Sequence, residues 1–282
     1  MKTVWITGAG GLIGSYLVRS ALQFVPGVEV VALTRERLDL TDSSAVRAEF
    51  RRQNPQLVIH CAALSKSTEC EVNPALAWKI NDLAVALLAE LAADIPLFFL
   101  STDLVFDGRI GNYDEAASVN PLSVYAETKA AAERIILANP KHTVIRLSLN
   151  GGTSPTGDRG FNEQMLQAWQ ADQTLRLFTD EFRSPIPAEV TARAIWELAG
   201  QNRPGLYHVA GSERLSRWQI GQLLAARWPK LNPRIDPGSL KQYQGAPRAP
   251  DTSLNCAKAQ KQLSFRLPGL TEWLSAHPNE VL

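Results

Sequence analysis

A tyrosine and a lysine four residues apart, Tyr125 and Lys129, have the spacing needed to exchange a proton with a substrate. Residues i and i+4 of a helix share one face, so a helix over this stretch brings the ammonium near the phenol. A nearby cation lowers the pKa of a phenol from its free value of about 10 and eases proton transfer near neutral pH. Ordinary surface packing is the alternative for such a pair.

Two hydroxyls and a carboxylate, Ser101, Thr102 and Asp103, directly follow the apolar stretch 97–100, which we interpret as a buried strand. Ligands of open parallel sheets bind at the carboxyl ends of the strands. These three side chains are therefore expected at a ligand-binding edge.

A turn of spacing G-x-x-G-x-x-G lies near the start of the chain, between a predicted strand and a predicted helix. This context favours a dinucleotide site, although a turn that only caps a helix is the alternative. The glycines permit a tight turn, close approach of a pyrophosphate and close packing of helix on strand, and the helix N-terminus attracts phosphate. The cofactor contacts expected here are Gly8, Gly11, Leu12, Ile13 and Gly14.

Thr34 and Arg35 directly follow the second predicted strand, which covers residues 29–33, and so lie at its carboxyl end. NAD-selective folds usually place an acid at this position for the ribose 2′-hydroxyl. Arg35 could instead receive a 2′-phosphate, so we expect NADPH to be preferred and NADH to remain an alternative. A solvated surface charge is the other interpretation of Arg35.

Three further segments supply expected cofactor contacts. An aspartate after the second strand could accept from the adenine amino group, whereas Asp42 or Thr41 is expected to cap the next helix. Small residues after the third strand let the cofactor lie against backbone. An asparagine inside a predicted helix is unfavourable by propensity, which indicates a bend or a hydrogen-bonding task, with an exposed outer face as the alternative. These residues are Asp39, Leu40, Cys61, Ala62, Ala63 and Asn81.

Strands and helices alternate over the first half of the chain, which predicts a doubly wound parallel α/β sheet. The predicted strands cover 3–7, 29–33, 57–61, 97–100 and 143–147. Four helices are predicted: one starts at residue 12, a second ends near residue 53, a third covers 75–93 and a fourth covers about 123–139. A loop is expected before Pro74.

A change of pattern near residue 150 predicts a second, smaller and partly discontinuous lobe over the cofactor cleft. We expect residues 1–149 to form the dinucleotide-binding domain, with return segments near 178–200, and 150–282 to form mainly the substrate-binding lobe. The predicted lobe elements are helices over 160–170, 188–200 and 216–228 and strands over 174–178 and 206–209.

Composition excludes several classes of protein. The 282 residues carry a net charge of +1, which argues against nucleic acid or an anionic membrane as the main partner. No apolar run reaches the length of a membrane span, and no signal peptide is expected. The three cysteines are an odd number without metal-binding spacing, which predicts reduced thiols and a cytoplasmic protein. The four histidines are scattered along the chain, so no His/Cys metal site is expected.

Taken together, these motifs resemble the extended short-chain dehydrogenase/reductase family over essentially the whole chain, and within it the dTDP-4-dehydrorhamnose reductases. The glycine turn, Thr102 and the Tyr125-x-x-x-Lys129 pair occur in the order and spacing of that family. Further matches are the segments 38–42, 101–108, 121–129, 144–146, 184–185, 207–208 and 247–248.

The resemblance implies a Rossmann-type sheet, NADPH or NADH, a nucleotide-sugar substrate and a catalytic set of Thr102, Tyr125 and Lys129. In the implied reaction a ketone carbon of a 4-keto-6-deoxy sugar receives hydride, Tyr125 protonates the oxygen and Thr102 aligns it. Lys129 would lower the pKa of Tyr125 and hold the nicotinamide ribose. The expected substrate contacts are Asp103, Val105, Phe106, Asn150, Arg183 and Arg248. Surface solvation is the alternative for both arginines, and a homodimer is left open.

Two departures from the family pattern place the identity of the sugar in question. Where these reductases usually read Arg-Thr-Ser-Trp-Val-Tyr-Gly, this chain reads Arg-Leu-Ser-Leu-Asn-Gly-Gly over 146–152, so Leu149 and Gly151 replace aromatic residues. The usual Gly-Ser-Pro-Thr loop reads Arg-Ser-Pro-Ile over 183–186.

Three rival functions use the same residues. A nucleotide-sugar epimerase is one, and a 4,6-dehydratase is a second, although Leu104 stands where dehydratases carry an acid for elimination. The third is a regulatory subunit resembling the β subunit of methionine adenosyltransferase.

Overall fold

Six strands form one central sheet in the computed structural model, which describes residues 2–278 and 280. Neighbouring strands are parallel, and their order is β2, β1, β3, β4, β5, β10. Their bounds, in that order, are Val28–Leu33, Lys2–Thr7, Leu57–His60, Leu97–Thr102, Thr143–Leu147 and Gly205–Val209. The order reverses between β1 and β3, the switch point at which such sheets bind ligands. The predicted doubly wound fold is confirmed.

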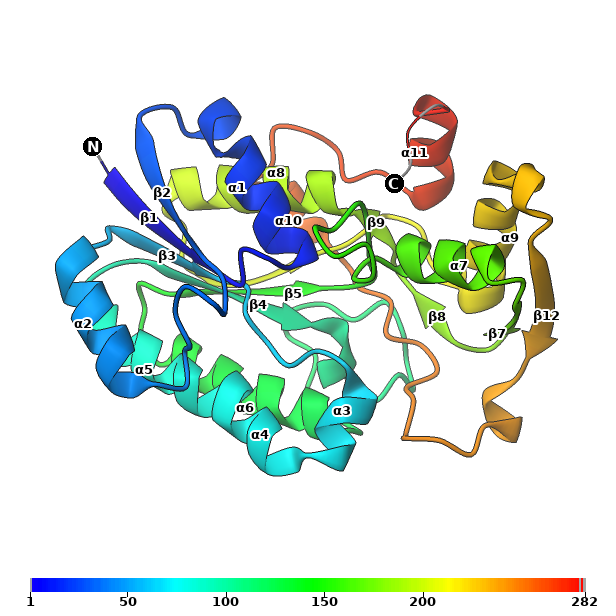
Figure 1. Ribbon diagram of the computed structural model, residues 1–282, viewed down its shortest axis with the longest axis horizontal. Coiled ribbons are helices and arrows are strands. Elements are labelled where there is room, and N and C mark those ends of the chain that lie inside the picture. Colours follow the sequence, from blue (N-terminus) through cyan, green and yellow to red (C-terminus); the bar gives the residue numbers. More distant parts are fainter. Residues whose placement is uncertain (1, 279, 281–282) are drawn as a thin grey trace.

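Helices cover both faces of the sheet (Figure 1). Alternate residues of β1 enter two separate cores, with Val4 and Ile6 on one face and Trp5 on the other, because successive side chains of a strand point to opposite faces. Complete burial of each such side chain contributes about 1.5–3 kcal/mol. The first face carries α1 (Leu12–Phe24) and α8 (Ala188–Gln201), and the second carries α2 (Ser43–Gln53), α5 (Ala84–Leu91) and α6 (Val124–Leu137).

The helix predicted over 75–93 is present but is not a regular α-helix. It consists of α4 (Pro74–Trp78), a π-helical turn (Lys79–Leu83) and α5. Asn81 lies inside the π-helical turn and is completely buried, so the predicted local irregularity is confirmed and the exposed alternative is wrong. Single π-turns of this kind often occur at functional sites.

A short helix, α3 (Ser67–Val72), lies in the segment for which we expected a loop. The Glu71 carboxylate accepts a hydrogen bond from the backbone N–H of Val124 at 2.8 Å, at the start of α6. The free N–H groups of a helix N-terminus favour such an anion. The unexpected helix therefore supports the element that carries Tyr125 and Lys129.

A smaller lobe lies to one side of the sheet, on the right in Figure 1. Three strand pairs contribute to it: β6 with β9, β7 with β12 and β8 with β11. Their bounds are Asn150–Gly151, Ile186–Pro187, Thr174–Phe178, Arg234–Gly238, Phe182–Arg183 and Leu215–Ser216. The helices in the second half of the chain, besides α8, are α7 (Phe161–Gln170), α9 (Arg217–Arg227), α10 (Ala257–Gln260) and α11 (Leu270–Ala276).

The chain returns from this lobe to the sheet over residues 188–209. Helix α8 packs on α1, and β10 pairs with β5 to form the last strand of the sheet. We predicted the strand at 206–209 but did not expect it in the central sheet. Within the described residues, no helix combines the length and apolar character that crossing a bilayer requires.

Candidate active site

The glycine turn joins β1 to α1 at the switch point of the sheet. Gly8 has a φ of +65°, and a Cβ there would lie 2.6 Å from the backbone nitrogen of Ala62. A Cβ on Gly14 would lie 2.3 Å from the carbonyl oxygen of Gly8, so these two glycines are required by the protein itself. Around Gly11 the nearest atom to a Cβ is the Gly8 oxygen at 3.2 Å. Helix α1 begins directly after Gly11, at Leu12 and Ile13, and among the described residues no side chain caps its N-terminus.

The end of β2 presents its polar residues to solvent. Arg35 is exposed, and within the described part of the chain no ion pair holds its guanidinium. The Asp39 carboxylate accepts from the Thr41 backbone N–H at 2.9 Å, which lowers the pKa of Asp39. Asp42 accepts from the backbone N–H groups of two residues at the start of α2, as its predicted capping role requires.

The segment after β3 is held by the buried asparagine of the π-helical turn. The Asn81 amide oxygen accepts from the Leu64 N–H at 2.8 Å, and its nitrogen donates to the Leu64 carbonyl at 3.1 Å and to the Thr128 hydroxyl at 3.1 Å. These bonds connect the segment containing Cys61, Ala62 and Ala63 to α6. Asn81 therefore shapes the backbone of the expected cofactor site and is not itself exposed to it.

The three predicted catalytic residues lie on β4 and α6. Thr102 ends β4, and its hydroxyl donates to the Asp103 carboxylate at 3.3 Å and acts to lower the pKa of the Tyr125 phenol. Burial and the Asp103 carboxylate act in the opposite direction, so the pKa of Tyr125 is raised overall. We predicted that Lys129 would lower this pKa; in this structure Lys129 is not among the groups that shift it, and burial is the largest effect.

The Lys129 side chain is only 2% exposed and has an unusual environment. Its ammonium lies 3.8 Å from the centre of the Phe99 ring, and among the described residues it has no hydrogen bond or ion pair. Burial lowers the pKa of Lys129 to about 7, against an opposing effect of Glu133. Burial of an ammonium that has no hydrogen-bonding partner in the protein is energetically costly.

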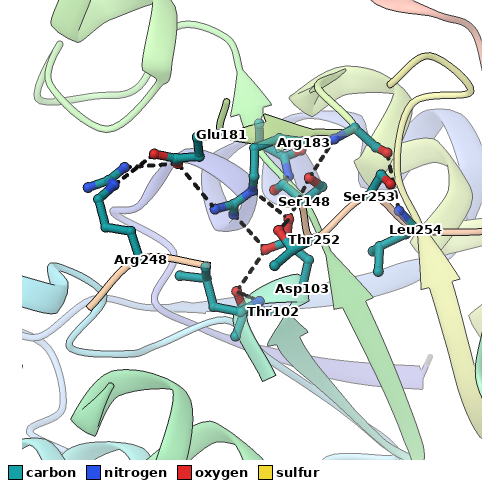
Figure 2. A network of polar contacts seen from close by, with 12 residues as sticks. Thr102, Asp103, Ser148, Glu181, Arg183, Arg248, Thr252, Ser253 and Leu254 are labelled. Atoms are coloured by element: carbon teal, nitrogen blue, oxygen red, sulfur yellow. Dashed lines mark hydrogen bonds and ion pairs between the residues drawn. The ribbon is translucent and has the colours of Figure 1, made fainter. Parts of the chain in front are cut away.

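A buried network of charges adjoins Thr102 (Figure 2). The Asp103 carboxylate is completely buried and forms a bidentate ion pair with Arg183, with nitrogen–oxygen distances of 2.6 and 2.8 Å. It also accepts from the hydroxyls of Ser148 at 2.7 Å and Thr252 at 3.2 Å. We predicted Asp103 and Arg183 as separate substrate contacts; in the structure each neutralises the charge of the other.

A second bidentate pair joins Arg248 to Glu181, at 2.7 and 2.9 Å (Figure 2). Glu181 is 2% exposed and also lies near Arg183. The register of β8 with β11 places Arg217 close by, and its backbone N–H donates to the Glu181 carbonyl. Burial lowers the pKa of Arg217 to about 10, and within the described residues its guanidinium has no hydrogen bond or ion pair.

A cavity opens between α3, the start of α6 and the segment 243–249. Its enclosed volume is about 100 Å³, which is smaller than the ~300–1,000 Å³ usual for a small-molecule site. Arg183 and Arg248 both line it, with Leu104, Ser123 and Tyr243 among the other lining residues. The two predicted arginines thus share one cavity.

Three predicted substrate contacts lie elsewhere. Val105 and Phe106 are completely buried, and Phe106 stacks on Tyr113 with ring centres 4.1 Å apart. The Asn150 amide is occupied by the Thr191 hydroxyl at 2.6 Å and by the Ser148 carbonyl at 3.0 Å. These residues contribute to the packing behind the cavity rather than to its surface.

A family model described as the RmlD substrate binding domain matches residues 1–281. The chain belongs to this family. A dTDP-4-dehydrorhamnose reductase of Mycobacterium tuberculosis is 30% identical over 96% of this chain and 90% of that protein. The methionine adenosyltransferase 2 subunit beta of Xenopus laevis is 27% identical over 91% of this chain and 81% of that protein.

A solved structure from Sulfolobus tokodaii, titled a hypothetical dTDP-4-dehydrorhamnose reductase, is similar in fold and sequence. Its TM-score is 0.85 at 30% identity, covering 96% of this chain and 97% of that chain. The family resemblance expected from the motifs is confirmed.

In this member of the RmlD family, two charged residues beside the cavity were missed by sequence reasoning. Glu181 stands two residues before Arg183, so in extended backbone the two side chains lie on one side, a signal that was available. Arg217 carried no comparable signal, because only the β8–β11 register places it near Glu181. At the two departures from the family pattern, Leu149 packs against the core and Gly151 pairs with Pro187.

Proposed function

We propose that this protein is an NAD(P)H-dependent oxidoreductase that reduces the ketone of a nucleotide-linked 4-keto-6-deoxy sugar. The observation that carries the proposal is the position of Thr102, Tyr125 and Lys129 at the carboxyl edge of a doubly wound sheet that begins with a dinucleotide turn. Relatives named dTDP-4-dehydrorhamnose reductase, described above, support the same reaction class.

The proposed cofactor site follows the switch point of the sheet. Gly11, Leu12 and Ile13 receive the pyrophosphate, Asp39 and Leu40 receive the adenine, and Ala62 and Ala63 form the floor. When bound, the cofactor supplies the hydride. Arg35 is exposed and unpaired at the end of β2, which favours NADPH over NADH. These contacts are the sequence predictions, carried forward as proposals.

Tyr125 is the proposed proton donor to the carbonyl oxygen. Its raised pKa keeps the phenol protonated at neutral pH, as a general acid requires before the reaction. The Thr102 hydroxyl is proposed to hydrogen-bond the same substrate oxygen and to align it. Lys129 holds the cofactor ribose, because its buried ammonium has hydrogen-bonding capacity that the described protein groups leave unused.

The nucleotide sugar is proposed to occupy the cavity lined by Arg183 and Arg248. Both guanidiniums are already paired with carboxylates, so they shape the cavity more than they supply free charge. The cluster of three arginines, Arg217 included, and two acids retains a positive charge that suits a diphosphate. In this proposal residues 1–149 bind the cofactor, with segments of the later chain returning to that domain, and 150–282 mainly bind the sugar.

The setting of the protein is a further part of the proposal. A net charge of +1 and three free cysteines favour a cytoplasmic enzyme that does not use nucleic acid as a partner. Homodimer formation is a prediction that sedimentation analysis at several protein concentrations would test.

The test is NADPH oxidation measured against a panel of nucleotide-linked 4-keto sugars. We expect turnover of at least one of them and none of the corresponding free keto sugars. Conversion of a nucleotide sugar to its epimer without net NADPH oxidation would support the epimerase instead. Tight NADPH binding with no turnover, together with co-purification of a synthetase, would support the regulatory subunit.

A further inference from the structure

A row of buried polar side chains crosses the sheet behind the proposed catalytic residues. Ser101 on β4 is in register with Arg146 on β5, and Arg146 is in register with His208 on β10. All three are at most 5% exposed. Ser101 directly precedes Thr102 in the chain, so this row lies immediately next to the catalytic edge.

The row converges on one carboxylate of α6, that of Glu133. Ser101 donates to it at 2.5 Å, and Arg146 donates to both of its oxygens, at 2.9 and 2.7 Å. The far side of the Arg146 guanidinium lies 3.4 Å from the His208 ring nitrogen. Glu133 is 3% exposed, so its charge is retained in the interior by these donors.

Glu133 stands one helical turn after Lys129 on the same face of α6. Both side chains are buried, and Lys129 has no closer ionic partner among the described residues. A negative charge one helical turn away in the interior favours the protonated form of Lys129 and raises its pKa.

The other titratable groups that face Lys129 are neutral at physiological pH. Burial raises the pKa of the Cys61 thiol to about 12 and lowers the pKa of the His60 ring to about 3. Phe99, on the remaining side, contributes only its ring face. Glu133 is therefore the charged group that acts on Lys129 within the described residues, and Arg146 is not among the groups that shift it.

We propose that Glu133, held by Ser101 and Arg146, is a positioning residue that keeps the Lys129 ammonium charged for its contact with cofactor. The inference rests on the proposed function for the use of that charge, but the charge itself can be measured on the protein alone. Buried ion pairs can often be replaced as a whole by neutral groups, so a role of this pair beyond stability is open to test.

The experiment follows the titration of Lys129 by NMR in protein carrying carbon-13-labelled lysine, without cofactor. The Lys129 signal is assigned by its loss in Lys129→Arg. Glu133→Gln alone leaves Arg146 uncompensated and is expected to destabilise the fold, so the decisive variant is Glu133→Gln/Arg146→Gln, in which both groups are neutral amides. We expect the Lys129 titration midpoint to fall by about one to two pH units in this variant.

A matched control is Glu163→Gln, which removes another buried carboxylate, at 6% exposure, from α7. It is expected to cost stability without moving the Lys129 midpoint. An unchanged midpoint in a folded Glu133→Gln/Arg146→Gln protein would overturn the proposal and leave the ion pair with a structural role only.

Cofactor binding provides the second measurement. The dissociation constant of NADPH is measured by calorimetry from about one pH unit below neutrality to about two units above it. In the double variant this constant should begin to rise at a lower pH than in the wild type. A shifted Lys129 midpoint in a protein that reduces no keto sugar would defeat the proposed function and leave this inference intact. Reduction of a keto sugar by the wild type, together with an unshifted Lys129 midpoint in the double variant, would support the proposed function and overturn this inference.

Discussion

Arg183 and Asp103 form a bidentate ion pair although 80 residues separate them in the chain. Asp103 has no exposed surface and Arg183 is 7% exposed. The pair joins the end of β4 to the strand β8 of the smaller lobe, so it fastens the substrate side of the site to the sheet. Because Asp103 directly follows Thr102 in the chain, this pair lies next to a proposed catalytic residue.

Removal of the charge at Asp103 is expected to destabilise the fold. Asp103→Asn removes the bidentate partner of the buried Arg183 guanidinium and, among the described residues, leaves only Glu181, at 4.0 Å, as its counter-charge. Loss of a buried partner typically costs about 3–5 kcal/mol of unfolding free energy. Urea denaturation measures the loss. Asp94→Asn is the matched control, because the Lys141–Asp94 pair is largely exposed and its removal should cost at most about 1 kcal/mol. Equal losses in the two variants would contradict the buried-pair assignment.

Gly11→Val is expected to abolish NADPH binding while the protein stays folded. A side chain at this position meets little of the protein, since the nearest atom to a Cβ is 3.2 Å away, but it occupies the space assigned to the pyrophosphate. Gly14→Ala is the contrasting variant, because its Cβ clashes with the Gly8 carbonyl and should lower the melting temperature. Calorimetric titration with NADPH and thermal unfolding separate the two effects. Normal affinity in Gly11→Val would remove the glycine turn from the cofactor site.

Arg35→Ala is expected to weaken NADPH binding about ten- to hundredfold, the usual cost of losing a hydrogen bond to a charged group. NADH lacks the 2′-phosphate, so its affinity should change little. Dissociation constants for both cofactors provide the measurement. Parallel changes in the two constants would show that Arg35 is a solvated surface charge.

Tyr125→Phe is expected to reduce turnover by about 10²–10⁴-fold, the typical contribution of one general acid. The ring and its packing remain, so NADPH affinity and the melting temperature should be preserved. Thr102→Val should also lower turnover without changing NADPH affinity, whereas Lys129→Ala should lower both turnover and NADPH affinity. Steady-state kinetics with the best sugar of the panel, together with cofactor titrations, distinguish these patterns. Near-normal turnover in Tyr125→Phe would refute the proton-donor assignment.

Lys129→Met is expected to stabilise the cofactor-free protein at neutral pH. The pKa of Lys129 in the folded protein is about 7, below the ordinary lysine value of 10.5, so the unfolded chain binds the proton more tightly. The free energy of unfolding of the wild type therefore rises with pH between these two values. The buried ammonium costs roughly a few kcal/mol at pH 7, and this cost becomes small once the pH exceeds the unfolded pKa.

Urea denaturation at neutral and alkaline pH measures this effect. The advantage of Lys129→Met over wild type should be largest near pH 7 and should shrink as the pH approaches the unfolded value, by the linkage relation. An advantage that is constant with pH would mean that the substitution acts through packing alone.

The sequence by itself determined the parts of this protein that depend on local patterns. The strand–glycine–helix turn at Gly8, the alternation of β1 and the face shared by Tyr125 and Lys129 all follow from neighbouring residues, because period and turn chemistry act over a few positions. The same local patterns identified Thr102 at the end of β4 and the cap at Asp42.

Only the tertiary structure decided which charges meet and how strongly they are buried. Arg248 pairs with Glu181 across 67 residues, and Arg217 joins them through the register of β8 and β11, none of which a local pattern contains. The expected low pKa of Tyr125 is absent because burial outweighs nearby charge, and burial is a property of the packed chain. For the same reason the state of Lys129 depends on Phe99 and Glu133 together, which become its surroundings only when α6 packs on the sheet.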